Sequence, residues 1–433
     1  MNNCRSHHTF ENWARTLRFK PERFCEPADE AQVVAIVKDA AARGGHVRVQ
    51  GGGHSWSDFI VTDDTLVSLD KLNRGLVADV LKKRYTVQAG IRLHNLLDNL
   101  TNDGLALKNL GSITQQSIAG ATATGTHGTG IRLGNLSTYI VGMKLVTGTG
   151  DVLTITDKDT ELLNAARVSI GALGIVTEVT LECVPIYNVD NAAYFCRFDE
   201  VVDRFDALNQ ENERFLMWWL VPAVGPKDNV FLVTHNNTGT PAGALGQADV
   251  VASGITEPLP MDTNDLLNMA LRLIRRQGCT RVLKRTGRYD RELTLPLLPV
   301  FHREFEYAFP TENSAPVLRA LKRIFEEHDI AITLPVEVRW VARDHTLLSP
   351  CNGRDVCYIG VSSQPNANEV YARLEPIFKH YGGRPHWGKH FSLTRREVQE
   401  MYPDTYDTFA RIRKELDPKG VFGNTLLREL FPY

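Results

Sequence analysis

The stretch Gly51-Gly52-Gly53-His54-Ser55-Trp56 follows a strand predicted at Val47–Val49, and it is the segment that decides the fold. Three successive glycines let the backbone approach a ligand closely and donate several N–H groups to a pyrophosphate. A second stretch, NLGSITQQSIAGATATGTHGTG at residues 109–130, holds only small and polar residues apart from three aliphatics. It offers a long wall for a flat, elongated cofactor. Taken singly, the glycine triplet is more often a turn and His54 more often a surface histidine, so only the two stretches together indicate a cofactor site.

Two familiar phosphate-binding motifs are excluded by single residues. A dinucleotide fingerprint G-x-G-x-x-G requires glycine where Trp56 stands. The stretch GRPHWGKH at residues 383–390 has the spacing of a P-loop, but His390 replaces the Ser or Thr that holds magnesium. Pro385 also lacks the backbone N–H that such a loop donates to phosphate. The sequence therefore disfavours an NTPase and fits a flavin enzyme better than a nicotinamide enzyme.

Length and charge restrict the number of domains and the kinds of partner that the protein can have. The chain has 433 residues, which predicts two domains, because single cores stop growing at about 250–300 residues. The balance of 49 Lys+Arg against 51 Asp+Glu gives no general attraction to nucleic acid or an anionic membrane, so neither is an expected partner. No apolar run approaches the roughly 18–20 residues that span a bilayer.

The N-terminus shows no apolar stretch of signal-peptide length, so we expect a cytoplasmic protein. The seven cysteines are odd in number, scattered and without a C-x-x-C pair. We expect all of them to be free thiols in a reducing compartment and expect no metal site.

Local patterns predict the main elements. Asp29 caps a helix whose apolar positions Val33, Ile36, Val37, Ala40 and Ala41 follow the 3.6-residue period, and Gly44 and Gly45 end it. A second amphipathic helix carries Leu93, Leu96, Leu97 and Leu100. Further strands are expected at 65–69, 85–88 and 174–184, a β-hairpin at 139–155, and alternating strands and helices from about 193 to 364. The Gly- and Pro-rich region 224–262 is expected to be a mobile surface connection.

Several motifs together resemble one family. The segment RVQGGGHSWSD at residues 48–58 resembles the first flavin loop of FAD enzymes of the vanillyl-alcohol-oxidase type, and residues 111–130 resemble the second. The motifs FENW at 10–13, VEVR at 336–339, RPHWGK at 384–389 and DPKGVFGN at 417–424 are similar to those of the branch of sugar-1,4-lactone oxidases and alditol oxidases. The resemblance covers nearly the whole chain and is weakest at 191–292.

This resemblance implies an α+β fold. Residues 1–187 would form a PCMH-type FAD-binding domain of two subdomains with the cofactor between them. Residues 188–385 would form a cap domain built on a large antiparallel sheet, and residues 386–433 would return to complete the FAD domain and the active site. We expect a monomer or a weak homo-oligomer.

The resemblance also implies which residues hold FAD. His54 occupies the position at which family members bond the 8α-methyl group of the flavin through an imidazole nitrogen, and a neutral imidazole is a suitable nucleophile. Backbone groups of Gly51, Gly52, Gly53, His54 and Ser55 would hold the pyrophosphate. The remaining cofactor residues would be Gly111, Ser112, Ser117, Gly120, Thr124, Gly125, Thr126, His127 and Ile175. His127 could equally be a loop histidine that caps the backbone.

Three charged residues are the catalytic candidates. Glu337 and Arg339 are two apart on a predicted strand and so share a face, which by itself would suggest only an ion pair. The family places both, with Lys389, over the flavin. Oxidation of an alcohol moves hydride to flavin N5 and leaves negative charge on the reduced ring, which a fixed cation stabilises. We assign that task to Arg339, substrate hydroxyls to Glu337, and substrate or flavin contact to Lys389, with Ser112 and Ser362 as weaker substrate contacts. The proton acceptor stays open among these groups.

The expected activity is oxidation of a sugar-derived alcohol, foremost an aldono-1,4-lactone, with transfer of electrons to O2 and release of H2O2. Gly360 stands where alditol oxidases carry a bulkier polar residue, which favours a ring-shaped substrate over a linear polyol. Gly111 has no side chain to block O2, whereas relatives with a larger residue there include dehydrogenases. The alternatives are an alditol oxidase, a tailoring alcohol oxidase or dehydrogenase, and a non-catalytic flavoprotein. The basic stretch 272–291 is interpreted as a solvated face, or else as a docking surface for an anionic partner.

Overall fold

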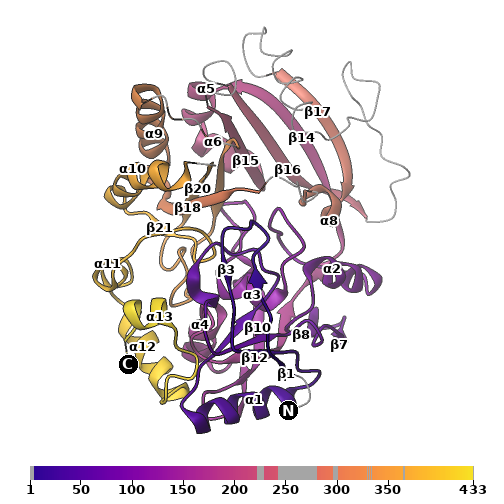
Figure 1. The fold of residues 1–433 in the computed structure, drawn as a ribbon. Helices are drawn as coiled ribbons and strands as arrows, with labels where there is room; N and C mark the ends of the chain where they lie inside the picture. Colours follow the sequence, from indigo (N-terminus) through magenta and orange to yellow (C-terminus); the bar gives the residue numbers. More distant parts are fainter. Residues whose placement is uncertain are drawn as a thin grey trace.

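The fold consists of one large sheet above two smaller ones in the view of Figure 1. The computed structural model describes residues 4–221, 229–241, 280–295, 301–328, 330, 332, 334–363 and 366–432. Helices and sheets are mixed along the chain, so the predicted α+β class is confirmed.

The first of the smaller sheets has the order β1-β4-β6-β5 and leads directly into the glycine triplet. Its strands are Cys4–Arg5, Arg23–Cys25, Thr65–Ser68 and Val47–Gln50, in that spatial order. Helix α1, Glu30–Arg43, begins at Asp29, whose side chain accepts from the Gln32 N–H, and ends at Gly44 with φ of 68°. Its apolar face packs on this sheet, which confirms the predicted helix. The short strands β2, Phe10–Glu11, and β3, Arg18–Phe19, pair separately.

The second of the smaller sheets has the order β11-β10-β12-β8-β7. Its strands, in that order, are Val152–Thr156, Ile140–Val146, Ile175–Glu182, Arg84–Gln88 and Gly75–Asp79. β10 and β11 pair antiparallel with Val146 opposite Val152, so the predicted hairpin is confirmed. Helices α2, Leu93–Asn102, and α4, Thr160–Arg167, contribute buried residues to the same core. Strands β9, Leu105–Ala106, and β13, Val184–Pro185, form a separate pair.

The large sheet is antiparallel throughout, with the order β17-β14-β16-β15-β19-β20-β18-β21. In that order the strands are Thr280–Arg288, Tyr187–Arg197, Asn229–Pro241, Arg214–Leu220, Val336–Val341, Val356–Ser363, Arg303–Pro310 and Arg384–Pro385. Helices α9, Ser314–His328, and α10, Ala367–His380, cover one face through an aromatic and aliphatic core. The short helices α5, Phe198–Val202, α6, Phe205–Glu211, and α8, Tyr289–Glu292, connect strands.

The mobile connection predicted at 224–262 is wrong for its described part. Residues 229–241 form strand β16, which pairs with both β14 and β15 in the middle of the sheet. Asn and Thr in this stretch are compatible with a strand because neighbouring strands supply its backbone partners. The other residues of 224–262 lie outside the described part of the chain.

The C-terminal helices return to the lower part of the molecule, beside the N-terminal elements (Figure 1). They are α11, Arg395–Met401, α12, Tyr406–Leu416, and α13, Thr425–Leu430. Asp417 organises the turn between α12 and α13, because its carboxylate accepts the N–H groups of Val421 and Phe422, each at 2.8 Å. The buried Arg48 then donates to the carbonyl oxygens of Phe422 and Gly171, which ties this turn to the strand before the glycine triplet.

The expectation that all cysteines are free thiols is wrong. Cys4 and Cys25 form a disulfide that joins β1 to β4, and Cys196 is also disulfide-bonded. Strand pairing brings Cys4 directly opposite Cys25, which sequence spacing alone does not reveal. Cys183, Cys351 and Cys357 are free and buried, as expected. The cytoplasmic location is expected from the N-terminus and from free cysteines. The disulfides remove the second of these observations, and the location stays a prediction.

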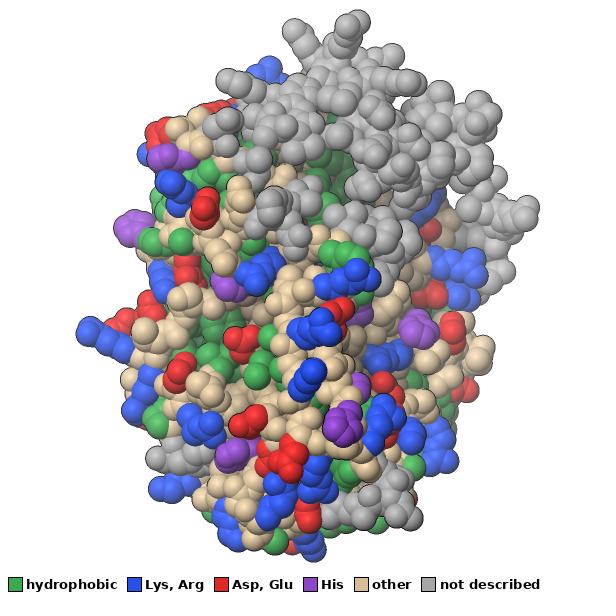
Figure 2. Space-filling view, viewed as in Figure 1, with side chains coloured by type: hydrophobic (Ala, Val, Ile, Leu, Met, Phe, Trp, Pro, Cys, Tyr) green, Lys and Arg blue, Asp and Glu red, His purple; other side chains and the backbone are tan. Residues whose placement is uncertain are grey.

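Charges of both signs are interspersed over the face shown in Figure 2. In the predicted basic stretch, Arg285 pairs with Glu292 and Arg288 with Asp290, each at 2.6 Å. These pairs fit the interpretation of 280–291 as a solvated face, and residues 272–279 lie outside the described chain. Among the described residues, no helix has the length and apolar character needed to cross a membrane.

Candidate active site

A cleft at the junction of the large sheet and the smaller sheets brings most of the predicted site residues together. It is lined by both glycine-rich stretches, by the inner faces of β18 and β19, and by His386, Gly388 and Lys389. The predicted residues in its lining are Gly51, Gly52, Gly53, His54, Ser55, Gly111, Ser112, Ser117, Gly120, Thr124, Thr126, His127, Ile175, Glu337, Arg339 and Lys389.

Two predicted site residues lie outside this lining. Gly125 forms the turn that ends the short helix α3, Ile118–Ala123, with a φ of +79° that favours glycine. Ser362 lies on the inner face of β20, opposite Glu304 of β18, and is 7% exposed. The structure thus gives Gly125 a backbone role, and Ser362 shares a face with Glu304 without being part of the cleft lining.

The glycine triplet packs directly on the second glycine-rich stretch. A Cβ atom at Gly51 would lie 2.6 Å from Ser117 Oγ, and one at Gly52 would lie 2.7 Å from the Gln115 carbonyl oxygen. Only glycine allows this approach. The loop is held from outside, because the Trp13 N–H donates to the Gly53 carbonyl and the Trp56 N–H donates to the Gly388 carbonyl.

The amide groups of this loop are available to a ligand. Within the described part of the chain, the N–H groups of Gly52, Gly53, His54 and Ser55 donate to no protein acceptor. Several free amides that line one cleft form a binding site for an anion such as a pyrophosphate. Ser117 caps α3 on the opposite wall by accepting the Gly120 N–H, which fixes the second stretch against the first.

His54 lies in the cleft beside aromatic side chains. Its ring stacks on Trp13 with a centroid separation of 5.7 Å. Burial, together with the charges of Arg92 and Lys389, lowers the pKa of His54 to about 4. The imidazole is therefore neutral at physiological pH and keeps a nucleophilic lone pair.

Arg339 is the centre of a buried charge cluster. Its Nη2 lies 2.9 Å from Glu306 Oε1 and 3.2 Å from Glu337 Oε2, and its Nη1 lies 3.5 Å from Ser112 Oγ. Burial opposes its charge, but Glu337 and Glu306 raise the pKa of Arg339, so it stays cationic. The ion pair suggested by the spacing of Glu337 and Arg339 is present, and both residues also line the cleft.

Lys389 forms a second ion pair next to the first. Its Nζ bonds Glu304 and lies 4.6 Å from the ring centroid of Trp56. Burial alone would raise the pKa of Glu304, but the charge of Lys389 lowers it to about 2. Glu304 is therefore a carboxylate, and Lys389 is fixed between it and the Trp56 ring.

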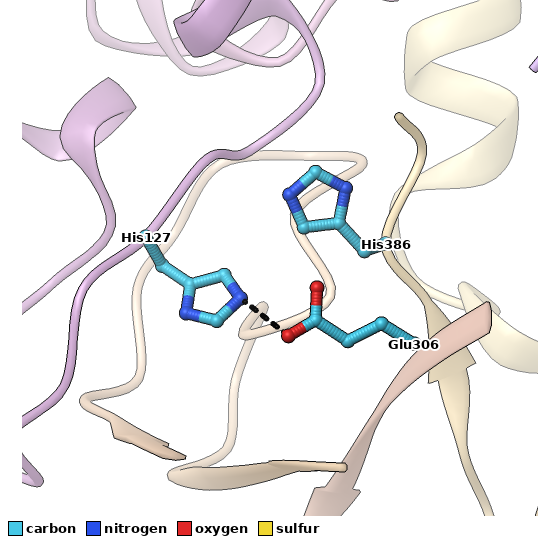
Figure 3. A group of neighbouring side chains, drawn as sticks. All are labelled: His127, Glu306 and His386. Atoms are coloured by element: carbon cyan, nitrogen blue, oxygen red, sulfur yellow. Dashed lines mark ion pairs between the residues drawn. The ribbon is translucent and has the colours of Figure 1, made fainter. Parts of the chain in front are cut away.

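His127 adds a third contact to the cluster. Figure 3 shows His127, Glu306 and His386 converging from three separate segments, with the pair between His127 Nε2 and Glu306 Oε1 dashed at 3.4 Å. His127 also stacks on Tyr358 at a centroid separation of 3.6 Å. Its Nδ1 lies 2.9 Å from the Gly128 carbonyl oxygen, so it has the backbone contact expected of a loop histidine as well as a place in the cleft lining.

Comparison with known proteins agrees with this arrangement. Residues 179–430 match the family of D-arabinono-1,4-lactone oxidase, and residues 21–156 match an FAD-binding domain family. The chain belongs to the D-arabinono-1,4-lactone oxidase family. It is 33% identical to L-gulonolactone oxidase of Mus musculus over 98% of each chain. It is 34% identical to L-gulono-1,4-lactone dehydrogenase of Mycobacterium tuberculosis, covering 97% of this chain and 98% of that one.

A solved structure supports the fold. Cholesterol oxidase from B. sterolicum superimposes with a TM-score of 0.79 at 16% sequence identity, covering 98% of this chain and 96% of that one. The FAD-binding, PCMH-type fold implied by the sequence is therefore confirmed, and FAD is the cofactor of this member of the lactone oxidase family.

The cleft fits FAD by its own chemistry. The glycine triplet leaves space that a Cβ atom would fill and presents free amides, as a diphosphate requires. The second stretch supplies a wall of small residues. At the far end of the cleft, Arg339 and Lys389 supply fixed cations whose side chains are largely buried. A flavin ring that gains negative charge on reduction is stabilised by such cations.

Sequence reasoning missed Glu304, Glu306 and His386. In REFEYAFP at residues 303–310, aromatic residues alternate with Glu304 and Glu306, and Phe305, Tyr307 and Phe309 face the helices. That period-2 pattern is a signal that two carboxylates share the opposite face. His386 stands within the RPHWGK motif at residues 384–389, but its position in the cleft follows only from the pairing of β21 with β18.

Proposed function

We propose that this member of the family is an FAD-dependent oxidase of an aldono-1,4-lactone. The observation that carries this proposal is the cluster of Arg339, Lys389 and three carboxylates. It lies in the same cleft as the two glycine-rich stretches, the first of which presents free amides. Carboxylates accept hydrogen bonds from the several hydroxyl groups of a sugar lactone. The names of the relatives, an L-gulonolactone oxidase and an L-gulono-1,4-lactone dehydrogenase, support lactones as the substrate class.

Each residue of the cluster has a defined task in this reaction. Bound FAD supplies a hydride acceptor for the carbinol carbon of the substrate. Glu337, whose carboxylate is oriented by Trp218 Nε1–H at 3.2 Å and by Arg339, grips substrate hydroxyl groups. Arg339 and Lys389 hold positive charge where negative charge develops, and both are oriented before the reaction by carboxylates.

Gly360 favours a ring-shaped substrate. A Cβ atom there would lie 3.5 Å from Glu304 Oε1 and 3.6 Å from Glu306 Cγ, which is ordinary contact distance. Packing therefore does not require glycine, and its lack of a side chain leaves space between the carboxylates. A compact hydroxylated ring fits such a space better than an extended polyol chain.

The test is an anaerobic bleaching screen. Protein purified with its yellow cofactor is mixed without oxygen with L-gulono-1,4-lactone, D-arabinono-1,4-lactone, a linear polyol and a free sugar. Loss of flavin absorbance with a lactone, and not with the polyol, supports the proposal. Bleaching by the polyol alone would make the protein an alditol oxidase, and no bleaching by any compound would make it a non-catalytic flavoprotein.

We also propose that FAD is attached covalently to His54. His54 follows the free-amide loop, lines the cleft, and has a pKa lowered to about 4, so its ring is neutral and nucleophilic. Acid precipitation should leave the yellow colour in the pellet. His54→Ala should still bind FAD reversibly because the loop amides remain, and colour that stays wholly in the supernatant of the parent protein refutes the attachment.

Dioxygen is the proposed electron acceptor, with H2O2 as product. Gly111 lines the cleft without a side chain, and a Cβ there would lie 3.1 Å from Thr126 Cγ2 and 3.3 Å from the His127 carbonyl oxygen. Gly111→Ala should therefore slow reoxidation by air-saturated buffer more than anaerobic reduction by substrate. Reoxidation of the parent enzyme over minutes would instead make it a dehydrogenase, the activity that the Mycobacterium tuberculosis relative is named for.

A further inference from the structure

Two acceptor atoms without partners, one on His127 and one on Glu306, lie close together on the wall of the cleft (Figure 3). His127 Nδ1 lies 2.9 Å from the Gly128 carbonyl oxygen, which can only accept, so the ring hydrogen belongs on Nδ1. Nε2 is then a bare lone pair, 3.4 Å from Glu306 Oε1. Within the described chain, neither His127 Nε2 nor Glu306 Oε2 has a hydrogen-bond partner, although the two residues are only 2% and 1% exposed.

The hydrogen-bonding capacity of His127 Nε2 and Glu306 Oε2 is satisfied only when a hydrogen-bond donor binds next to them. Buried polar atoms in native proteins are almost always hydrogen-bonded, and an unpaired one is costly. A donor can reach both atoms from the cleft, because both residues are part of its lining. A hydroxyl group of the substrate is a donor of the required kind.

The other carboxylates of the cluster, and its lysine, are already engaged. Lys389 bonds Glu304, and Glu337 is held by Arg339 and the Trp218 N–H. His386 Nδ1 accepts the Gly388 N–H at 3.0 Å, so the hydrogen of that ring lies on Nε2.

We propose that His127 Nε2 accepts the proton of the reacting substrate hydroxyl and that the Glu306 carboxylate stabilises the imidazolium formed. The inference rests on the proposed lactone oxidation. The O–H bond breaks, its proton forms an N–H bond on His127, and its electron pair becomes the second bond of the new carbonyl. The hydride leaves the same carbon with its own electron pair, and the flavin is the group reduced.

The surroundings suit a proton better than a metal ion. His127, Glu306 and His386 bring three ligand atoms within 4.8 Å of one another. Arg339, however, already places a guanidinium 2.9 Å from Glu306 Oε1, and this charge opposes a bound cation. A single proton transferred to His127 adds only one positive charge next to the Glu306 carboxylate.

The groups around His127 keep it neutral before the reaction. They are Glu304 and Glu306 on β18, Glu337 and Arg339 on β19, Tyr358 on β20, and His386 and Lys389 on the segment after β21. Burial and the charge of Arg339 lower the pKa of His127, which Glu306 partly offsets. The base form therefore dominates at neutral pH, and the rate of reduction should fall as the pH drops through the pKa.

The kinetic test uses the holoenzyme in anaerobic stopped-flow with the best lactone of the screen. His127→Gln should lower the limiting rate of flavin reduction by about 10²–10⁴, the usual contribution of a general base, and abolish the acidic limb of its pH profile. The half-saturating lactone concentration should change by less than about threefold. Glu306→Gln should retain the acidic limb but displace it to lower pH. His235→Gln, a buried histidine of β16 outside the cleft, is the matched control and should leave the rate unchanged.

A second measurement does not depend on turnover. Histidine-selective nitrogen-15 NMR of the intact protein, with the His127 signal assigned by its loss in His127→Gln, should show hydrogen on Nδ1 and none on Nε2 at neutral pH. Hydrogen on Nε2 would overturn the proposal, as would a His127→Gln variant that reduces flavin at the parent rate. If no lactone bleaches the parent protein, the proposed function has failed instead, and only the NMR arm bears on His127.

Discussion

Replacing Arg339 by methionine should change both the stability of the protein and the rate of flavin reduction, and the two effects can be measured separately. Arg339 holds Glu306 at 2.9 Å and Glu337 at 3.2 Å, and Glu306 is only 1% exposed. Methionine fills similar volume but leaves the Glu306 carboxylate without its cation. Breaking a buried ion pair in this way costs about 3–5 kcal/mol, a large part of the roughly 5–15 kcal/mol that stabilises a typical protein. The variant should be visibly less stable.

The same substitution should slow flavin reduction for a different reason. Loss of one preorganised group that stabilises developing charge lowers rates by about 10²–10³. The double variant Arg339→Met with Glu306→Gln removes the unpaired buried charge and should recover most of the lost stability, because a neutral amide is far less costly to bury. It should not recover the rate.

Denaturant unfolding and anaerobic stopped-flow reduction measure the two effects on the same preparations. A ratio of bound flavin to protein equal to that of the parent checks that the cofactor site is intact. If Arg339→Met is reduced within about threefold of the parent rate, the role of Arg339 in charge stabilisation is refuted. If the double variant recovers both stability and rate, the slow step of the single variant came from misfolding.

Three further changes follow from the same geometry. Lys389→Met should raise KM or lower kcat. The pKa of Glu304 is about 2 against an ordinary 4.5, so the stability that Glu304 contributes in the parent is present above about pH 4.5 and lost as the pH falls toward 2. Acid unfolding of the variant should show a weaker or reversed dependence of stability on pH. Gly52→Ala should weaken FAD binding strongly, because its Cβ meets the Gln115 carbonyl at 2.7 Å, whereas Gly239→Ala, with open space around it, should bind FAD like the parent in a titration by fluorescence. Asp417→Asn should lower the free energy of unfolding, measured with denaturant, by about 1.5–3 kcal/mol. The charged carboxylate accepts two N–H groups, whereas the amide that replaces it has one neutral acceptor oxygen.

Local signals predicted the elements that depend on local interactions. The cap at Asp29, the αL residue Gly44 and the spacing of Val33, Ile36 and Val37 define α1, and all three act within one helix. The two glycine-rich stretches were identified because close approach of backbone requires glycine wherever it occurs in a chain. The family motifs extended this to the cofactor.

Contacts set by strand pairing could not be predicted in the same way. The Cys4–Cys25 disulfide depends on the register of β1 against β4, and the place of residues 229–241 depends on two neighbouring strands. Likewise, the place of Ser362 opposite Glu304, on the face that carries the carboxylates but outside the cleft lining, follows from the register of β20 against β18. Composition and spacing do not encode which residues end up opposite each other.

The charge cluster itself depends on a register that the apolar residues enforce. Glu306 and Glu337 both lie opposite Gly360 of β20, so the two carboxylates meet across one glycine. A slip of one residue in β18 would turn Glu304 and Glu306 into the core and expose the aromatic positions between them. Phe305, Tyr307 and Phe309 prevent that slip by packing on Phe378 of α10, with ring centroids 5.0 to 5.4 Å apart. The same alternation therefore stabilises the cap and positions the groups that face the substrate, and a variant that weakens the aromatic face should disturb catalysis without touching a single charged residue.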